Sequence, residues 1–152
     1  MNLNQILNNI NSFNTAKNTV DYELTEFFDK IGSKILNLGE LKSHDRLEII
    51  KSLFEFIKRQ SSELEENWAF IHLIESIDKP TYKIYDKELI EFNKANPTQI
   101  SILLLNRHTN SLEEVELQKG INLLKEISER KEIPKLVTDM AKEFYEYQLN
   151  SE

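Results

Sequence analysis

The sequence contains no cysteine. This absence excludes disulfide bonds, thiolate nucleophiles and zinc sites built on cysteine ligands. Glycine and proline are also scarce, with three of each in 152 residues. Because all-β folds need frequent turn residues, this scarcity favours a helical fold.

Long apolar runs are missing as well. No stretch approaches the length of a membrane span. The N-terminal segment MNLNQILNNINSFN lacks the basic start and the continuous apolar core of a signal peptide. We therefore expect a cytoplasmic protein that does not enter a membrane.

Basic residues are outnumbered, with 19 against 26 acidic residues and a formal net charge of −7. They are spread along the chain, with no more than two in succession, so no basic patch is available for a phosphate backbone and nucleic-acid binding is not expected. An acidic surface suits a basic protein partner, although such a charge also simply keeps a protein soluble. The length and the 39% of hydrophobic residues fit one globular domain over residues 1–152.

Apolar residues recur at intervals of three and four, the spacing of amphipathic helices. The expected helices cover residues 3–13, 19–38, 43 or 45 to 57, 62–79, 86–95, 97–108, 111–131 and 134–147. Ser62 with Glu65, and Ser111 with Glu114, are interpreted as capping pairs, and residues 81–85 as briefly extended. The prediction is an all-α fold of about eight helices, arranged as an irregular bundle or as a short stack of antiparallel helical hairpins.

The stretch NWAFIHLIESID, residues 67–78, holds the single tryptophan and one of three histidines. On a helical wheel its apolar residues cover more than half of the circumference, which predicts a central helix with Trp68 in the core. A narrow polar stripe remains, formed by Glu65, Ala69, His72 and Ser76 with Glu75 at its edge. His72 is either an ordinary solvent-facing histidine or, with Glu65, part of a groove that meets a partner.

The spacing of the His, Glu and Asp residues gives little support to a metal-dependent reaction. A di-iron bundle needs Glu three residues before His, and Leu41, Ala69 and Leu105 occupy those positions. The dipeptide His44-Asp45 is similar to that of helical phosphohydrolases, but no histidine precedes it. We interpret it as the start of a helix, with Asp45 as the cap.

Paired carboxylates give a similar result. The pairs Glu63/Glu66 and Glu75/Asp78 are similar to those with which all-α nucleotide pyrophosphatases bind magnesium. Both pairs fall within one predicted helix, where they cannot turn back to share a metal ion. We predict no catalytic residue, no cofactor and no metal site, so the chain is not expected to be an enzyme. An all-α metal-dependent hydrolase is the weakest of the alternatives.

The segments ENWAFIHLIESIDKPTYKIYDKELIEFNKANP and ISILLLNRHTNSLEE, with the two helices expected after them, resemble helical immunity proteins. These are the small acidic proteins, some of them HEAT-like, that neutralise toxins in bacterial polymorphic and contact-dependent inhibition systems. The resemblance spans roughly residues 65–147 and rests on size, acidity, helical hairpins and a tryptophan-bearing helix. It assigns no individual functional residue.

The resemblance implies a protein that binds a basic toxin of nuclease type and covers its active site. The predicted contact surface consists of Glu65, Glu66, His72, Glu75, Asp78, Tyr82 and Tyr85. The alternative from another class is a structural scaffold whose wide apolar faces form a self-interface. A monomeric mass in light scattering would exclude that scaffold, and the sequence leaves monomer and homodimer both open.

Overall fold

The computed structural model describes residues 2–14, 21–64 and 67–150, without the side chains of residues 61–64. These residues form eight α-helices and no strand, which confirms the predicted all-α fold. The helices are α1 (Leu3–Ser12), α2 (Asp21–Leu36), α3 (Ser43–Leu64), α4 (Trp68–Ser76), α5 (Lys83–Ala95), α6 (Gln99–Asn110), α7 (Glu114–Ser128) and α8 (Lys135–Asn150). Within the described ranges no helix combines the length and apolar character needed to cross a bilayer.

The contacts of the chain fall into two compact units, Met1–Glu88 and Leu89–Glu152, with the boundary inside α5. This division of contacts does not test the prediction that residues 1–152 form one domain, so that statement remains a prediction.

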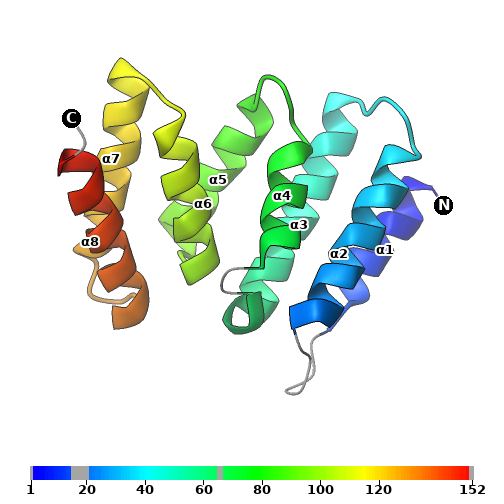
Figure 1. Cartoon of the computed structure of the whole chain (residues 1–152), viewed down its shortest axis with the longest axis horizontal. Helices are drawn as coiled ribbons and strands as arrows, with labels where there is room; N and C mark the ends of the chain where they lie inside the picture. The colour runs from blue at the N-terminus through cyan, green and yellow to red at the C-terminus, as the bar shows by residue number, and fades with distance from the viewer. Residues whose placement is uncertain (1, 15–20, 65–66, 151–152) are drawn as a thin grey trace. The chain divides into compact units, whose positions relative to one another are not determined.

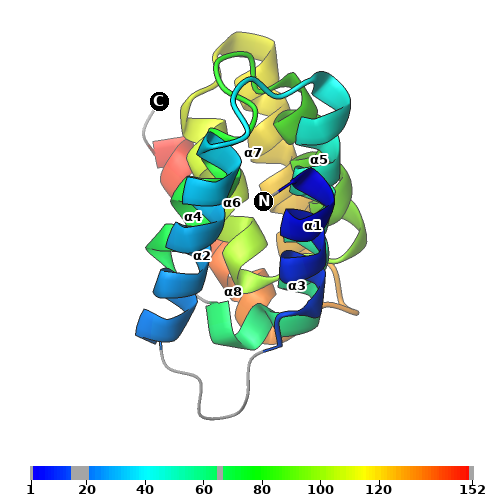
Figure 2. The ribbon, with the colours of Figure 1, turned by 90° about the vertical axis from the view of Figure 1, so that its right-hand side faces the viewer.

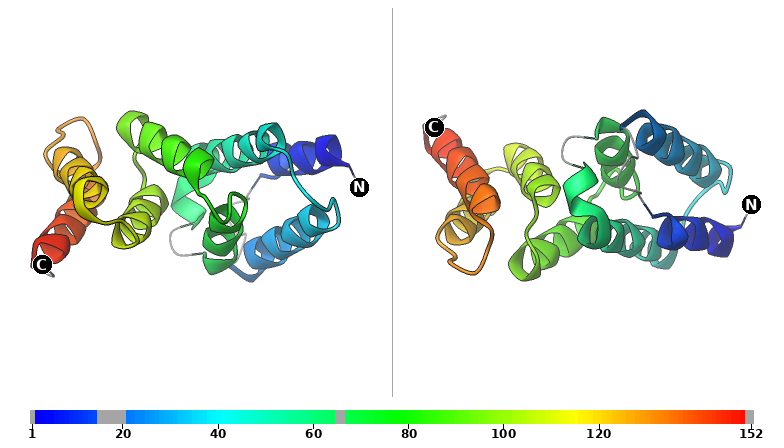
Figure 3. Two further views of the ribbon diagram at one scale, coloured as in Figure 1. Left: turned by 90° about the horizontal axis from the view of Figure 1, so that it is seen from above. Right: turned by 90° about the horizontal axis from the view of Figure 1, so that it is seen from below.

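The first unit is built from two antiparallel helical hairpins, α1–α2 and α3–α4. Helix α1 packs against α3 and helix α2 packs against α4. The unit therefore has two layers, one of α1 and α3 and one of α2 and α4, as three views show (Figures 1, 2 and 3). Of the two predicted architectures, the stack of helical hairpins describes this unit.

A cluster of five phenylalanines joins the four helices of the first unit. Phe28 of α2 meets Phe56 of α3 and Phe70 of α4 edge-on, with ring centroids 5.2 and 5.0 Å away. Phe13, just after α1, stacks on Phe27 at 4.0 Å. Edge-to-face and offset pairs add to the free energy gained by burial. This aromatic cluster is the core beneath the α2–α4 layer.

The start of α4 differs from the prediction. We expected a helix from Ser62, but α3 continues to Leu64 through non-helical backbone angles at Gln60. The predicted Ser62–Glu65 capping pair lies outside the described side chains. Helix α4 instead begins after Asn67, whose Oδ1 accepts a hydrogen bond from the N–H of Phe70 at 3.0 Å.

Asn67 also connects α4 to α2. Its Nδ2 donates to Oδ1 of Asp21 at 2.8 Å and to Oγ1 of Thr25 at 3.2 Å. Since Asn67 is only 1% exposed, each of these polar contacts replaces water that the side chain has lost. The first turns of α2 and α4 are thereby held together.

Two other helix starts are corrected. Helix α5 begins at Lys83, so the extended segment predicted for residues 81–85 is wrong from residue 83 onward. Ser111 does not cap α7, because its hydroxyl donates to the carbonyl of His108 at 2.6 Å and closes α6. Helix α7 follows Glu113, which makes no side-chain capping bond.

In the second unit, α7 packs against α8 and α6 packs against both. Its core consists of Ile102, Leu105, Leu123, Leu124, Ile127, Val137 and Ala141. Gln148, buried near the end of α8, donates to Oδ1 of Asn106 at 2.9 Å and to Oδ1 of Asn110. Such a buried polar contact fixes how far α8 can slide along α6, because displacement would leave the amides unpaired.

Helices α6 and α7 are in close contact at Gly120. A Cβ atom at this position would lie 2.6 Å from Oγ1 and 2.9 Å from Cγ2 of Thr109. Thr109 is fully buried and its hydroxyl donates to the carbonyl of Leu105 at 2.7 Å, so it has no free direction to move. Glycine is therefore required here by packing.

We predict that Gly120→Ala lowers the free energy of unfolding by about 1–3 kcal/mol through overpacking. Urea denaturation followed by circular dichroism measures this change. Gly32→Ala is the matched control in helix α2, since its Cβ would meet only Cδ1 of Leu73 at 3.6 Å. That variant should keep or gain stability, because alanine favours a helix by about 1 kcal/mol over glycine. Equal stability of the two variants would contradict the steric argument.

Candidate functional site

The polar face of α4 lines a groove shared with α2. This α2–α4 groove has a volume of about 630 Å³. Its lining residues are Phe28, Asp29, Gly32, Ser33, Ile35, Leu36, Gly39, Leu41, Ala69, His72, Leu73, Ser76 and Ile77. Three of the four residues in the predicted polar stripe are among them, namely Ala69, His72 and Ser76. The fourth, Glu65, lies outside the described residues.

The floor of the groove is apolar and its edge is amphipathic. Phe28, Leu73 and Ile77 are buried beneath it, while Leu36 on α2 is 80% exposed. Such an exposed leucine beside an apolar concavity leaves hydrophobic surface in water. A continuous patch of exposed hydrophobic residues is typical of a binding site, whereas a single exposed residue is common on any protein surface.

Trp68 is not in the core as predicted, and it adds exposed apolar surface one turn before His72, which lines the groove. Its side chain is 49% exposed, and its ring lies 5.8 Å from that of His72, centroid to centroid. The two residues are one helical turn apart on α4, so both rings lie on the same side of the helix. The remaining apolar residues predicted for this helix, from Phe70 to Ile77, are buried as expected.

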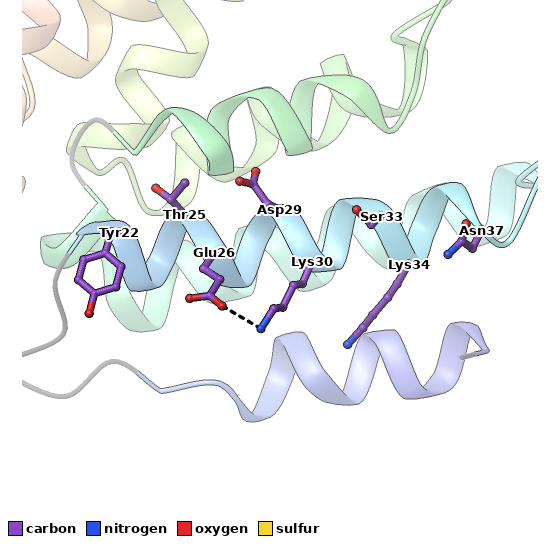
Figure 4. Close-up of a pocket in the computed structure, with 8 residues that line it drawn as sticks. All are labelled: Tyr22, Thr25, Glu26, Asp29, Lys30, Ser33, Lys34 and Asn37. Carbon is purple, nitrogen blue, oxygen red and sulfur yellow. Dashed lines mark ion pairs between the residues drawn. The ribbon is translucent and has the colours of Figure 1, made fainter.

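The outer face of α2 carries a stripe of polar and charged side chains next to the groove (Figure 4). Its members are Tyr22, Thr25, Glu26, Asp29, Lys30, Ser33 and Lys34 of α2, with Asn37 just after the helix. Figure 4 shows Thr25 and Asp29 on the side of α2 that faces α4, and Glu26, Lys30 and Lys34 on the opposite side. Asp29 and Ser33 belong to both the stripe and the groove.

The charged side chains on this face differ in whether they form an ion pair. Glu26 pairs with Lys30 at 3.0 Å between Oε1 and Nζ. No ion pair joins Asp29 to any residue that the structure describes. Asp29 is the one residue of the groove lining that carries a formal charge when His72 is neutral. The groove is therefore an apolar surface with a single unpaired carboxylate on its α2 side.

Two residues of the predicted contact surface are interior and are corrected. Asp78 is 1% exposed: its Oδ2 accepts from the N–H groups of Ile84 and Tyr85 at 2.7 and 3.0 Å, and its Oδ1 pairs with Nη1 of Arg46 at 3.5 Å. Tyr85 is 2% exposed, with its ring 6.4 Å from that of Phe54. Both were assigned to the surface because polar residues usually lie there. Instead, Asp78 is buried where it meets α5 and Arg46, and Tyr85 is buried where its ring packs near Phe54.

The other predicted contact residues divide into three groups. Glu65 and Glu66 lie outside the described residues. Glu75 and Tyr82 are half-buried and do not line the groove. Only His72 lies in the groove itself. A role in binding stays a prediction for all of these residues.

The α2 half of the groove was missed in the sequence, where residues 19–38 were interpreted only as an amphipathic helix. A signal was present in Leu36, which is exposed although it directly follows the buried Ile35. Gly32 and Ser33 on the same face add small side chains that leave room above the backbone. An apolar residue on an otherwise polar face, next to small residues, is the pattern that could have revealed the site.

Among the residues that the structure describes, no group of three or more His, Asp or Glu side chains is placed to hold a metal ion. Comparisons of the chain with protein-family models, characterised proteins and solved structures found no match.

We predict that Asp78→Ala lowers the free energy of unfolding by about 2–4 kcal/mol, because two N–H groups of α5, one of them buried, and the partly buried Arg46 guanidinium would lose their partner. Chemical denaturation measures the loss. Asp29→Ala is the matched control, since an exposed and unpaired carboxylate should contribute within about 0.5 kcal/mol. A loss below about 1 kcal/mol for Asp78→Ala would refute the structural role.

Proposed function

We propose that this chain is a non-catalytic protein-binding module and that a partner protein occupies the α2–α4 groove. The observation that carries the proposal is the half-exposed Trp68, packed against His72 at a groove whose opposite edge is the exposed Leu36. Tryptophan is among the residues that contribute most to binding free energy at protein interfaces, above all beside a pocket. Binding would remove the apolar edge and floor from water.

The partner we propose is a basic toxin domain of nuclease type, and the chain would act as its immunity protein in the bacterial cytoplasm. The net charge of −7 and the resemblance of residues 65–147 to helical immunity proteins support this choice. Neutralisation would occur by occlusion, as the helical surface covers the cationic active-site cleft of the toxin. No covalent chemistry is needed from either protein.

We predict that the tagged chain, incubated with a lysate of its source bacterium, retains one stoichiometric basic protein whose nuclease activity is suppressed in the complex. Ser33→Trp should weaken this binding by at least about tenfold, because a bulky ring fills the groove at a cost near that of one hot-spot contact. Ser33 is exposed, so the substitution spares the core. Affinity is measured by surface plasmon resonance with the purified partner.

Ser33→Ala is the matched control and should bind like the unsubstituted chain. Circular dichroism and the melting temperature show whether both variants fold. Undiminished binding by folded Ser33→Trp would place the partner elsewhere on the molecule. Recovery of the chain itself as the sole bound protein would favour the self-associating scaffold.

Charge should control the speed of association more than the lifetime of the complex. We predict that the association rate constant falls at least about tenfold as NaCl rises from about 0.01 to 0.5 M, because salt screens charges beyond a few ångströms. The dissociation rate constant should change little, since it depends on the groove contacts. Stopped-flow fluorescence of Trp68 follows both, and an association rate that ignores salt would exclude electrostatic steering.

A further inference from the structure

Building on the protein-binding role proposed above, we infer that the α2–α4 groove receives an amphipathic helix of the partner, with a lysine or arginine placed opposite Asp29. The apolar anchors of this helix follow the spacing i, i+3 or i+4, and i+7. Three features of the groove favour a helix with a basic residue: the length of the groove, the hydrogen bonding of its backbone and its single charged side chain.

The length of the groove matches two helical turns. Its α2 side runs from Asp29 to Leu36 and its α4 side from Ala69 to Ser76. At a rise of 1.5 Å per residue, each side is about 10 Å long. Anchors at i and i+7 of a docked helix span the same distance. Gly32 on the α2 side and Ala69 on the α4 side have little or no side chain, which leaves room for the anchors of the partner.

The backbone of the groove favours a helix over an extended segment. Both walls are helices, whose N–H and C=O groups are engaged along the helix. An extended peptide laid between them would find no backbone partners, and its own polar groups would be desolvated against Phe28, Leu73 and Ile77. A helix satisfies its own backbone and presents only side chains, which is the common way for peptides to occupy an apolar groove.

The charge of the groove specifies the polar part of the partner. Asp29 faces α4 and has no ion pair with any described residue (Figure 4). A docked helix would remove part of its hydration shell, and an apolar or acidic neighbour would leave that loss uncompensated. A lysine or arginine at the flank of the docked helix would form an ion pair with Asp29 and so compensate for the lost hydration. Glu26, in contrast, is already paired with Lys30.

A phage-displayed library of helix-forming peptides tests this inference without the natural partner. Selection on the intact chain, with counter-selection on Ser33→Trp, retains peptides that depend on the groove. We expect their consensus to combine apolar residues at i, i+3 or i+4, and i+7 with a flanking Lys or Arg. For a purified consensus peptide, Asp29→Asn should raise the dissociation constant about fivefold, the upper range for an exposed ion pair.

Reversal of the charge provides the sharper comparison. Selection on Asp29→Lys should replace the basic residue of the consensus with Glu or Asp. Glu26→Lys is the matched control: it makes the same change of net charge on the side of α2 turned away from α4, and it should leave the basic preference intact. A preference that shifts equally in both variants would reflect net charge alone and would overturn the assignment to Asp29.

The outcomes separate this inference from the protein-binding role itself. Groove-dependent peptides without helical spacing, or without a basic residue, overturn the inference and leave the protein-binding role in place. If no groove-dependent peptide emerges, the inference is wrong, and the capture experiment decides the rest. Partner binding that is lost in Ser33→Trp then preserves the proposed function, whereas unchanged binding keeps a protein-binding role and removes its assignment to the α2–α4 groove.

Discussion

The α2–α4 groove depends on the buried carboxylate of Asp78, which lies at one end of it. Asp78 follows Ile77 of the groove floor, and it accepts the first free N–H groups of α5 while it pairs with Arg46. Arg46 in turn donates to the carbonyl of Leu41, another residue of the groove lining, from both Nε and Nη2. One charged network therefore connects the end of the α4 wall to Leu41 of the groove lining, to α3 and to the start of α5. Breaking it would affect the end of the groove as well as the stability of the unit, because the same residues contribute to both.

The floor of the groove is supported by the aromatic cluster, and Phe28 belongs to both. Its inner edge meets the rings of Phe56 and Phe70, so its position is determined from below by close packing. Rigid, well-packed side chains lose little conformational entropy when a partner binds above them. The same ring thus contributes to folding on one side and to a preformed binding surface on the other.

Helical spacing was sufficient to predict eight helices and the buried face of α4, because both follow from the local period of apolar residues. The errors concern polar residues with distant partners. Asp78 is drawn inside by α5 and Arg46, and Asn67 takes the capping position because Asp21 and Thr25 supply its other hydrogen bonds. Trp68 was placed in the core because its neighbours in sequence are apolar, yet its side chain is half-exposed and its ring lies near that of His72. These outcomes depend on tertiary neighbours that a single sequence does not reveal.

Asp29, which pairs with no residue that the structure describes, and the acidic net charge both favour a basic partner. The two features act at different distances. Net charge acts over about a Debye length and favours any basic molecule, so it increases encounter rates with little selectivity. Asp29 acts only at contact, where an unmatched carboxylate disfavours a partner that lacks a cation at that position. Acidity alone would thus attract many basic proteins. The groove and its one charge would retain only those that present a fitting helix with a cation in register.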